Sequence, residues 1–269
     1  MIRVAVFGAA GRMGRKLIQV LHSHEACELG VAIERSEHPL LDQDSGSVAL
    51  GVQNQIRFKS IEHLSADEYD IGIDFTVPEV TLAHLDVCAR LGRGLVIGTT
   101  GFTQVQHKQL RAHGSAIGLV CAPNMSVGVN LTFKLIEMAA KSMGQGADIE
   151  VIEAHHRNKL DAPSGTALKM GEILADALGR DLDACAVYGR EGRTGVRDPN
   201  TIGFETIRAG DIVGDHSVLF ASEGETLEIS HRATSRINFA RGAVQAAHWL
   251  SQQPAGLYDM QDVLGLRTR

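Results

Sequence analysis

Three features are scarce in this sequence: aromatic residues, closely spaced cysteines and long apolar runs. Aromatic residues make up 4% of the chain, and no basic stretch is interleaved with them. Together with a formal net charge of -6, this composition argues against a protein that binds nucleic acid. We therefore expect a small molecule as the partner of this chain.

The 4 cysteines are far apart, at Cys27, Cys88, Cys121 and Cys185, and none of them forms a C-x-x-C pair. This spacing argues against a disulfide framework and against a zinc site, so we expect reduced thiols and no bound metal. No run reaches the ~18 apolar residues that a membrane span requires, and the apolar segment at the N-terminus is too short for a signal peptide. The sequence therefore predicts a cytoplasmic protein.

Length and composition favour two domains. A chain of 269 residues, of which 44% are hydrophobic and 22% charged, is long enough for two globular domains. We predict an α/β protein in which residues 1–126 and 237–269 form a Rossmann-type domain with a parallel sheet, and residues 127–236 form a smaller α+β domain with a mixed sheet. The C-terminal helix, 237–250, is expected to return to the first domain, with hinges near residues 125–127 and 235–237.

The chain begins with a strand, a glycine-rich turn and a helix, which is the context of a dinucleotide-binding site. The turn is Gly8-Ala9-Ala10-Gly11-Arg12-Met13-Gly14, with alanine at the middle position where the commoner G-x-G-x-x-G pattern has glycine. A second predicted strand, 29–33, ends at Glu34 and Arg35. A carboxylate at this position could bind the ribose hydroxyls of a dinucleotide, and a guanidinium beside it could bind a 2′-phosphate.

Further strands alternate with helices, which predicts a parallel sheet whose ligands bind at the carboxyl ends of the strands. We expect strands at 70–75, 94–98 and 118–121, whereas residues 37–57 show no regular pattern and are predicted to be mainly loop. Residues that follow these strands should trace one rim of the sheet: Thr76, Thr99, Thr100, Ala122, Pro123, Asn124 and Met125.

The second domain should combine two helices with four strands. Because short turns join the last three strands, we predict antiparallel pairing between consecutive strands. The first helix carries an apolar stripe of Leu131, Leu135, Met138 and Ala139. The expected order is a helix at 126–143, a strand at 147–154, a helix at 164–178, a long loop at 188–203 and strands at 204–209, 213–221 and 226–232.

The segment Glu153–Thr166 concentrates residues that could bind a small dianion. It starts at the end of the predicted strand 147–154, and its cationic side chains are His155, His156, Arg157 and Lys159. Ser164 is a favourable N-cap for the helix that follows, so the backbone N–H groups of Gly165 and Thr166 in the first turn offer an anion site. An ordinary solvated loop could carry the same charges, but the glycine turn upstream supplies the second half of an active site.

Three other functions share part of these features. A dehydrogenase of an amino-acid semialdehyde would share the glycine turn but would need a cysteine nucleophile; Cys121 lies just before Pro123, and no partner histidine is indicated. A redox-sensing binding module would keep the nucleotide fold but add a DNA-binding or partner segment, and none is visible. A metal hydrolase that uses His155 and His156 is disfavoured because adjacent residues on a strand point to opposite faces.

Five motifs together resemble the 4-hydroxy-tetrahydrodipicolinate reductases, also called dihydrodipicolinate reductases. They are Gly8–Gly14, Asp74-Phe75-Thr76, Gly98-Thr99-Thr100-Gly101, Asn124-Met125-Ser126-Val127-Gly128 and Glu153–Thr166, of which the last is the most specific. The resemblance extends over essentially the whole chain. It implies a homotetrameric enzyme of the diaminopimelate route to lysine, which transfers a hydride from NADH or NADPH to a dehydrated cyclic dicarboxylate and yields tetrahydrodipicolinate.

The resemblance also implies roles for individual residues. His155 would be the general acid and Lys159 its partner. The substrate carboxylates would bind to His156, Lys159, Ser164, Gly165 and Thr166. The cofactor would bind to Gly8, Ala9, Ala10, Gly11, Arg12, Met13, Glu34, Arg35, Gly98, Thr99, Thr100, Ala122, Pro123, Asn124 and Met125. The chain departs from the family's pattern at Val77, where relatives can carry a basic or imidazole residue.

Overall fold

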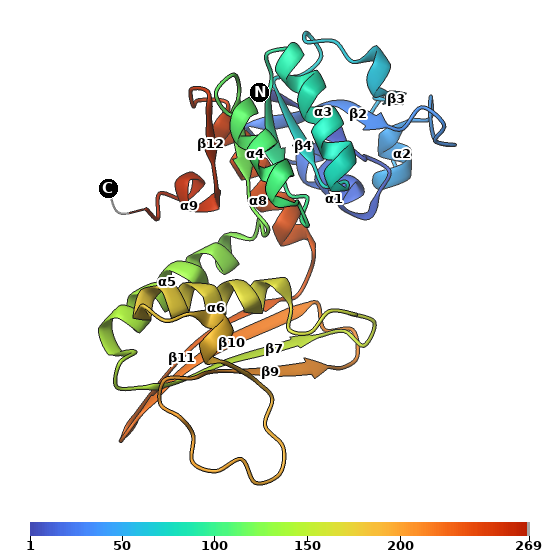
Figure 1. The fold of residues 1–269 in the computed structure, drawn as a ribbon. Helices are drawn as coiled ribbons and strands as arrows, with labels where there is room; N and C mark the ends of the chain where they lie inside the picture. Colours follow the sequence, from blue (N-terminus) through green and yellow to red (C-terminus); the bar gives the residue numbers. More distant parts are fainter. Residues whose placement is uncertain (268–269) are drawn as a thin grey trace. The chain divides into compact units, whose positions relative to one another are not determined.

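The computed structural model describes residues 1–267 and divides into two compact units (Figure 1). Unit 1 consists of Met1–Val127 together with the chain from Arg236 onward, and unit 2 consists of Gly128–Ser235. Each division lies one residue from the boundary that the sequence predicts. Among residues 1–267, no helix is both long and apolar enough to cross a membrane.

Unit 1 is built on a seven-stranded sheet in which every neighbouring pair of strands is parallel, which confirms the predicted Rossmann-type sheet. The order is β12-β6-β5-β4-β1-β2-β3, so the direction of strand succession reverses at β1, where sheets of this kind bind their ligands. The strands are β1 (Ile2–Phe7), β2 (Cys27–Glu34), β3 (Phe58–Ser60), β4 (Ile71–Asp74), β5 (Gly94–Ile97), β6 (Gly118–Cys121) and β12 (Gly256–Tyr258).

Helices cover both faces of this sheet. Since successive residues of a strand point to opposite faces, a single strand can contribute side chains to a core on either face. Val4 and Val6 of β1 belong to one core with α1 and α8, whereas Ala5 and Phe7 belong to a second core with α3 and α4. The helices are α1 (Arg12–His22), α2 (Ser45–Ala49), η1 (Ile61–His63, a 3-10 turn), α3 (Pro78–Arg90), α4 (Gln104–His113), α8 (Ile237–Leu250) and α9 (Met260–Val263).

The C-terminal part of the chain returns to unit 1, as predicted. The predicted stripe of α8, which consists of Ala240, Ala243, Val244 and Ala247, is fully buried in the core that contains α1. Beyond α8, the three residues of β12 pair with β6 and extend the sheet. The sequence did not predict β12, because three residues are too few to show an alternation.

The segment 37–57, predicted to be mainly loop, contains the short helix α2. The carboxylate of Asp44 caps this helix by accepting a hydrogen bond from the Ser47 N–H at 2.8 Å. The same carboxylate accepts hydrogen bonds from the N–H groups of Asn54 at 3.2 Å and Gln55 at 2.7 Å. One acidic side chain thus orders a segment whose apolar pattern is poor.

Unit 2 has a five-stranded mixed sheet of order β11-β10-β7-β9-β8, which confirms the predicted α+β fold. Two helices, α5 and α6, lie on one face of the sheet (Figure 1). Ile149 and Val151 of β7 pack there with Phe133 of α5 and Met170 of α6. The elements are α5 (Val127–Met143), β7 (Asp148–His155), α6 (Gly165–Leu178), α7 (Leu182–Cys185), β8 (Ala186–Tyr188), β9 (Ile202–Arg208), β10 (Gly214–Ser222) and β11 (Glu225–Ala233).

The predicted antiparallel pairing of consecutive strands is correct for β10 and β11 but wrong for β9 and β10. Strand β7 lies between β9 and β10, parallel to the first and antiparallel to the second. The connection after β9 therefore crosses the end of β7. There the Ala209 N–H donates to the His155 carbonyl at 2.9 Å, and the Arg157 N–H donates to the Gly210 carbonyl at 3.2 Å.

The predicted apolar stripe of α5 is also wrong in part. Leu131, Leu135 and Met138 are 44%, 41% and 56% exposed, although Ala139 is buried. The buried face of the helix is rotated from this stripe and carries Val129, Asn130, Thr132, Phe133, Ile136, Ala139 and Ala140. Polar Asn130 and Thr132 on the buried face concealed it in the sequence.

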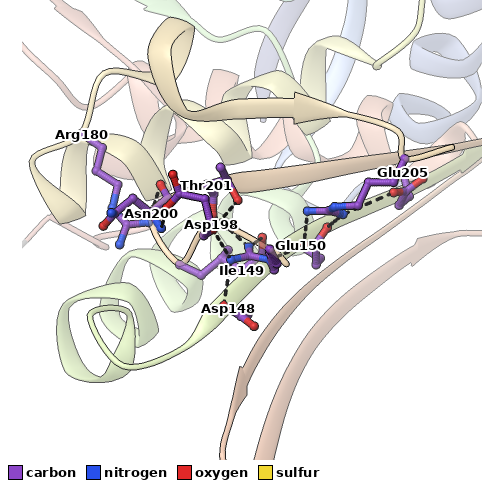
Figure 2. A network of polar contacts seen from close by, with 10 residues as sticks. Asp148, Ile149, Glu150, Arg180, Asp198, Asn200, Thr201 and Glu205 are labelled. Carbon is purple, nitrogen blue, oxygen red and sulfur yellow. Dashed lines mark hydrogen bonds and ion pairs between the residues drawn. The ribbon is translucent and has the colours of Figure 1, made fainter. Parts of the chain in front are cut away.

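The face of β7 opposite to Ile149 and Val151 holds the long loop between β8 and β9 (Figure 2). Glu150 accepts two hydrogen bonds from Arg190, both at 2.9 Å, and one from Arg197 at 3.0 Å. Arg197 also donates to Asp148 at 2.8 Å. The loop, predicted at 188–203, is thus fixed to the sheet by arginine–carboxylate contacts.

The packing of α8 predicts the effect of a small substitution. A Cβ atom at Gly242 would lie 1.7 Å from the carbonyl oxygen of Met125, so Gly242→Ala must displace backbone. We expect this change to lower the thermal midpoint of unit 1 and to cost about 1–3 kcal/mol of stability. Gly146→Ala is the control, because nothing lies within 4 Å of a Cβ atom there. Equal midpoints for the two variants in a denaturation scan would contradict the proposed packing.

Candidate functional site

A glycine turn at the carboxyl end of β1 forms the centre of the candidate site in unit 1. Gly8 has a φ of 64°, in the left-handed region that favours glycine. A Cβ atom at Gly14 would lie 2.4 Å from the Gly8 carbonyl oxygen, so α1 approaches the turn too closely for a side chain. Among the side chains of residues 1–267, none caps α1 at Gly11. The N–H groups of its first turn are therefore available to an anion.

Glu34, at the end of β2, is bound to this turn. Its Oε1 accepts a hydrogen bond from the Ala10 N–H at 2.8 Å, and its Oε2 accepts one from the Arg35 N–H at 3.3 Å. The side chain of Arg35 is exposed. The carboxylate singled out in the sequence thus lies beside the glycine turn, and Arg35 is the next residue along the chain.

A cavity of about 290 Å³ in unit 1 brings distant parts of the predicted site together. Arg12 and Met13 from the glycine turn line it, and so do Pro123, Asn124 and Met125 from the segment after β6. Phe75 of the motif Asp74-Phe75-Thr76 also lines it, and so do Arg236 and Phe239, for which the sequence predicted no role. Arg236 immediately precedes α8, and only the return of this helix to unit 1 places it here.

The turn after β5 lies on the same rim. The Gly98 N–H donates to the Asp74 carbonyl at 2.8 Å, and the Ala122 N–H donates to the Ile97 carbonyl at 3.2 Å. These contacts join the ends of three strands. Thr99 is buried and Thr100 is exposed, so the two threonines of this turn have different surroundings.

In unit 2, His155 is the last residue of β7, and Glu153 orients its imidazole. The ring Nδ1 lies 2.6 Å from Glu153 Oε2, a distance at which Nδ1–H donates to the carboxylate and leaves Nε2 as the other functional nitrogen. Burial lowers the pKa of His155, with Lys159 and Arg208 acting in the same direction, although Glu153 opposes the shift. The imidazole of the free protein is therefore shifted towards its neutral form, and an anion that binds nearby would favour the protonated form.

Glu153, for which the sequence predicted no role, connects most of this cluster. It is 1% exposed and accepts two hydrogen bonds from Arg208, both at 2.8 Å, and one from the Ser164 N–H at 3.0 Å. Burial alone would raise the pKa of Glu153, but the hydrogen bonds from Arg208 and His155 outweigh it and hold the pKa below its usual value. The carboxylate is therefore ionised and fixes both His155 and the start of α6.

His216 of β10 is a further histidine of this cluster, and no sequence pattern marks it. Its ring meets that of His155 edge-to-face at 5.1 Å, and its Nε2 shares a hydrogen bond with Ser164 Oγ at 2.9 Å. Ser164 Oγ also accepts a hydrogen bond from the Ala167 N–H at 3.1 Å, which confirms Ser164 as the N-cap of α6. Gly165 and Thr166 follow in the first turn of this helix.

The loop after β7 carries the remaining predicted residues. Lys159 donates a hydrogen bond to Asp161 at 2.8 Å, and this contact lowers the pKa of Asp161. The Lys159 N–H donates to the His156 carbonyl at 3.1 Å, which folds the loop back on itself. The side-chain Nδ1 of His156 is buried and has no hydrogen-bond partner among residues 1–267. A ligand carboxylate could supply that partner.

The structure argues against Cys121 as a nucleophile. Burial, with a further contribution from Asp259, raises the pKa of its thiol to about 11. Such a thiol is protonated at neutral pH, whereas the thiolate is the nucleophilic form. The semialdehyde dehydrogenase alternative therefore loses its catalytic residue.

Two families match adjoining parts of the chain. The family described as "Dihydrodipicolinate reductase, N-terminus" matches residues 2–125, and that described as "Dihydrodipicolinate reductase, C-terminus" matches residues 128–264. Among solved structures, a dipicolinate-bound dihydrodipicolinate reductase from Paenisporosarcina sp. TG-14 is similar, with 27% sequence identity and a TM-score of 0.77. The alignment covers 97% of this chain and 98% of that one.

Two other solved structures share the fold alone. An amine dehydrogenase from Mycobacterium smegmatis has 13% identity and a TM-score of 0.61, over 100% of this chain and 97% of that one. A probable dehydrogenase from Thermotoga maritima has 11% identity and a TM-score of 0.60, over 97% of this chain and 92% of that one. The fold is thus common to several dehydrogenases.

The burial of His216 predicts that acid weakens the fold. Burial, and then the nearby His155, lower its pKa from 6.5 to about 4. Between these pH values the unfolded chain binds more protons than the folded one. The free energy of unfolding should therefore be highest above pH 6.5 and fall by up to about 3 kcal/mol towards pH 4.

Thermal midpoints measured across this pH range test the prediction. His216→Gln should show a shallower decline than the wild type because it lacks the titrating group. His63→Gln removes an exposed histidine of unit 1 and should keep the wild-type decline. The same slope in all three proteins would contradict the role of His216.

Proposed function

The chain belongs to the dihydrodipicolinate reductase family, and we propose that its His155 and Lys159 carry the acid step of the reaction. The enzyme transfers a hydride from NADH or NADPH to the dehydrated cyclic dicarboxylate derived from 4-hydroxy-tetrahydrodipicolinate. The product is tetrahydrodipicolinate, in the diaminopimelate route to lysine. Hydride addition to a conjugated imine leaves negative charge on the ring, so a cation and a proton donor placed beside the ring lower the barrier.

The contact between His155 and Glu153 carries this proposal. Because Nδ1–H is held by the carboxylate at 2.6 Å, the proton for the substrate comes from Nε2 of the imidazolium. The two carboxylates of the substrate favour that protonated form, since an opposite charge nearby raises the pKa of a histidine. Lys159 adds a second positive charge on the adjoining loop, where it stabilises the developing anion.

The substrate carboxylates bind to the rest of this cluster in our proposal. His156 has an imidazole nitrogen without a protein partner among residues 1–267, and the first turn of α6 offers the N–H groups of Gly165 and Thr166. Ser164 positions this turn through its contacts with Glu153 and His216. The similar enzyme from Paenisporosarcina sp. TG-14 binds dipicolinate, a flat ring with two carboxylates, and we propose that unit 2 takes ligands of the same class.

Unit 1 binds the dinucleotide in this proposal, and NADH or NADPH supplies the hydride when bound. The uncapped start of α1 and the absence of a side chain at Gly14 fit a pyrophosphate on Gly8–Met13. Glu34 takes the adenosine ribose, and the exposed Arg35 can take a 2′-phosphate, so both cofactors are used. The nicotinamide half lies against Gly98, Thr99, Thr100, Ala122, Pro123, Asn124 and Met125.

We further propose that the enzyme is a cytoplasmic homotetramer that assembles through unit 2. Apolar side chains of the unit 2 sheet are exposed in the single chain, with Tyr188 at 58%, Ile207 at 48% and Leu227 at 40%. They lie on three strands of this sheet, β8, β9 and β11, and apolar side chains that are exposed in a single chain are typical of residues that a partner subunit covers.

Val77 is 53% exposed at the start of α3, and its side chain offers the cofactor neither a charge nor a hydrogen bond.

Substitutions in unit 2 should separate turnover from substrate binding. Lys159→Gln removes a charge aimed at the developing anion and should lower kcat about 10²–10³-fold. His155→Gln removes the general acid and should lower kcat about 10²–10⁴-fold. His156→Ala should mainly raise the substrate KM, and the inhibition constant of dipicolinate should rise with it. Steady-state kinetics with the condensation product of pyruvate and aspartate semialdehyde measure all three effects.

Lys169→Gln is the matched control, because the Lys169 side chain on α6 is 45% exposed and pairs with Glu172. It should keep the wild-type kcat and KM. All variants should keep their affinity for NADH and NADPH, since the cofactor residues belong to unit 1. Turnover near that of the wild type in both His155→Gln and Lys159→Gln would refute the proposed acid step.

A further inference from the structure

Asp74, the last residue of β4, is fully buried, and both of its carboxylate oxygens are occupied. Oδ1 accepts hydrogen bonds from the Thr76 N–H and the Thr76 hydroxyl, both at 2.7 Å. The Thr81 hydroxyl donates to the same oxygen at 3.2 Å. Oδ2 lies 2.6 Å from His84 Nδ1, and the His84 ring stacks on Phe7 with 4.6 Å between ring centroids.

This one carboxylate connects three segments of the rim. Thr76 belongs to the turn after β4, Thr81 belongs to α3, and Thr99 belongs to the turn after β5. The hydroxyl of Thr81 is 3.2 Å from that of Thr76 and 2.8 Å from that of Thr99, and Thr99 also reaches Asp74 at 3.4 Å. The hydroxyls and the carboxylate form a closed network below the rim.

The network also sets the position of groups that line the site. The methyl group of Thr76 lies 2.8 Å from where a Cβ atom of Gly8 would be, so this turn packs against the glycine turn. A Cβ atom at Gly98 would lie 2.2 Å from the ring of Phe75, which lines the 290 Å³ cavity. The position of Phe75, between Asp74 and Thr76, therefore sets the wall of the cavity, whereas the glycine turn is also held by Glu34 at the Ala10 N–H.

We propose that Asp74 is the positioning residue of the nicotinamide half of the cofactor site. It acts through Thr76, Thr81 and Thr99 and holds the Phe75 wall and the Gly98 backbone at fixed places. The adenosine half is held separately, by Glu34 on the Ala10 N–H. The inference rests on the proposed cofactor site, but it adds that the two halves of this site are fixed by different carboxylates.

Asp74→Asn tests this division. It keeps the size of the side chain but puts an amide where one oxygen now accepts several hydrogen bonds, so buried donors lose their acceptor. We expect the affinity for NADH and NADPH to fall about tenfold and kcat to fall with it, while ADP-ribose, which lacks the nicotinamide, binds within about twofold of the wild type. Calorimetric titration with the three nucleotides, together with steady-state kinetics, measures these values.

Two further variants complete the test. Thr81→Val removes only the bridging hydroxyl. It should lower the affinity for NADH and NADPH less than Asp74→Asn does and keep the affinity for ADP-ribose. This variant also tests the inference if Asp74→Asn does not fold. Asp70→Asn, at the other end of β4, breaks the contact with Arg3 and should lower the thermal midpoint without changing any of the three affinities.

An equal loss of affinity for NADH and ADP-ribose in Asp74→Asn and Thr81→Val would show a merely structural role and overturn the inference. Wild-type affinities of Thr81→Val for all three nucleotides would also overturn the inference. Failure of the wild-type protein itself to bind NADH or NADPH would overturn the cofactor site and the inference together, and the wild-type titration distinguishes this result from the others.

Discussion

The carboxylate of Glu153 is the contact on which the geometry of unit 2 depends most. Glu153 is 1% exposed. Burying a charge is unfavourable unless hydrogen bonds and an opposite charge compensate for the lost contact with water. Arg208 supplies the opposite charge through two hydrogen bonds, and His155 and the Ser164 N–H supply the other donors. The general acid and the anion site at the start of α6 are thus oriented by one buried group.

Unit 1 uses a related arrangement at Asp74. In both units a buried acid at or near the carboxyl end of a strand binds donors from the segments that follow it. Such an acid binds no ligand itself in this account, but it fixes the turns that do. Both carboxylates lie near rims that bind anionic ligands, and they are tolerated there because protein donors surround them. The donors are His84 and three threonines for Asp74, and Arg208 for Glu153.

The sequence predicted those elements whose signal is local. The strand predicted at 147–154, the N-cap at Ser164 and the strand, turn and helix around Gly8 are confirmed by the structure. Contacts between distant segments left no pattern to detect: Arg208 lies 55 residues after Glu153, and nothing in its surroundings marks it as the partner. For the same reason the short turn after β9 was interpreted as a hairpin, although the chain there crosses the end of β7.

The turnover of Glu153→Gln tests the central claim most directly. An amide at this position can donate to His155 Nδ1 and stabilise the wrong tautomer, so we expect kcat to fall about 10²–10⁴-fold while the KM for NADPH is unchanged. Glu150→Gln is the matched control, since Glu150 is on the opposite face of the same strand and is also bound by arginines (Figure 2). It should keep the wild-type kcat. A kcat for Glu153→Gln equal to that of Glu150→Gln would contradict the account.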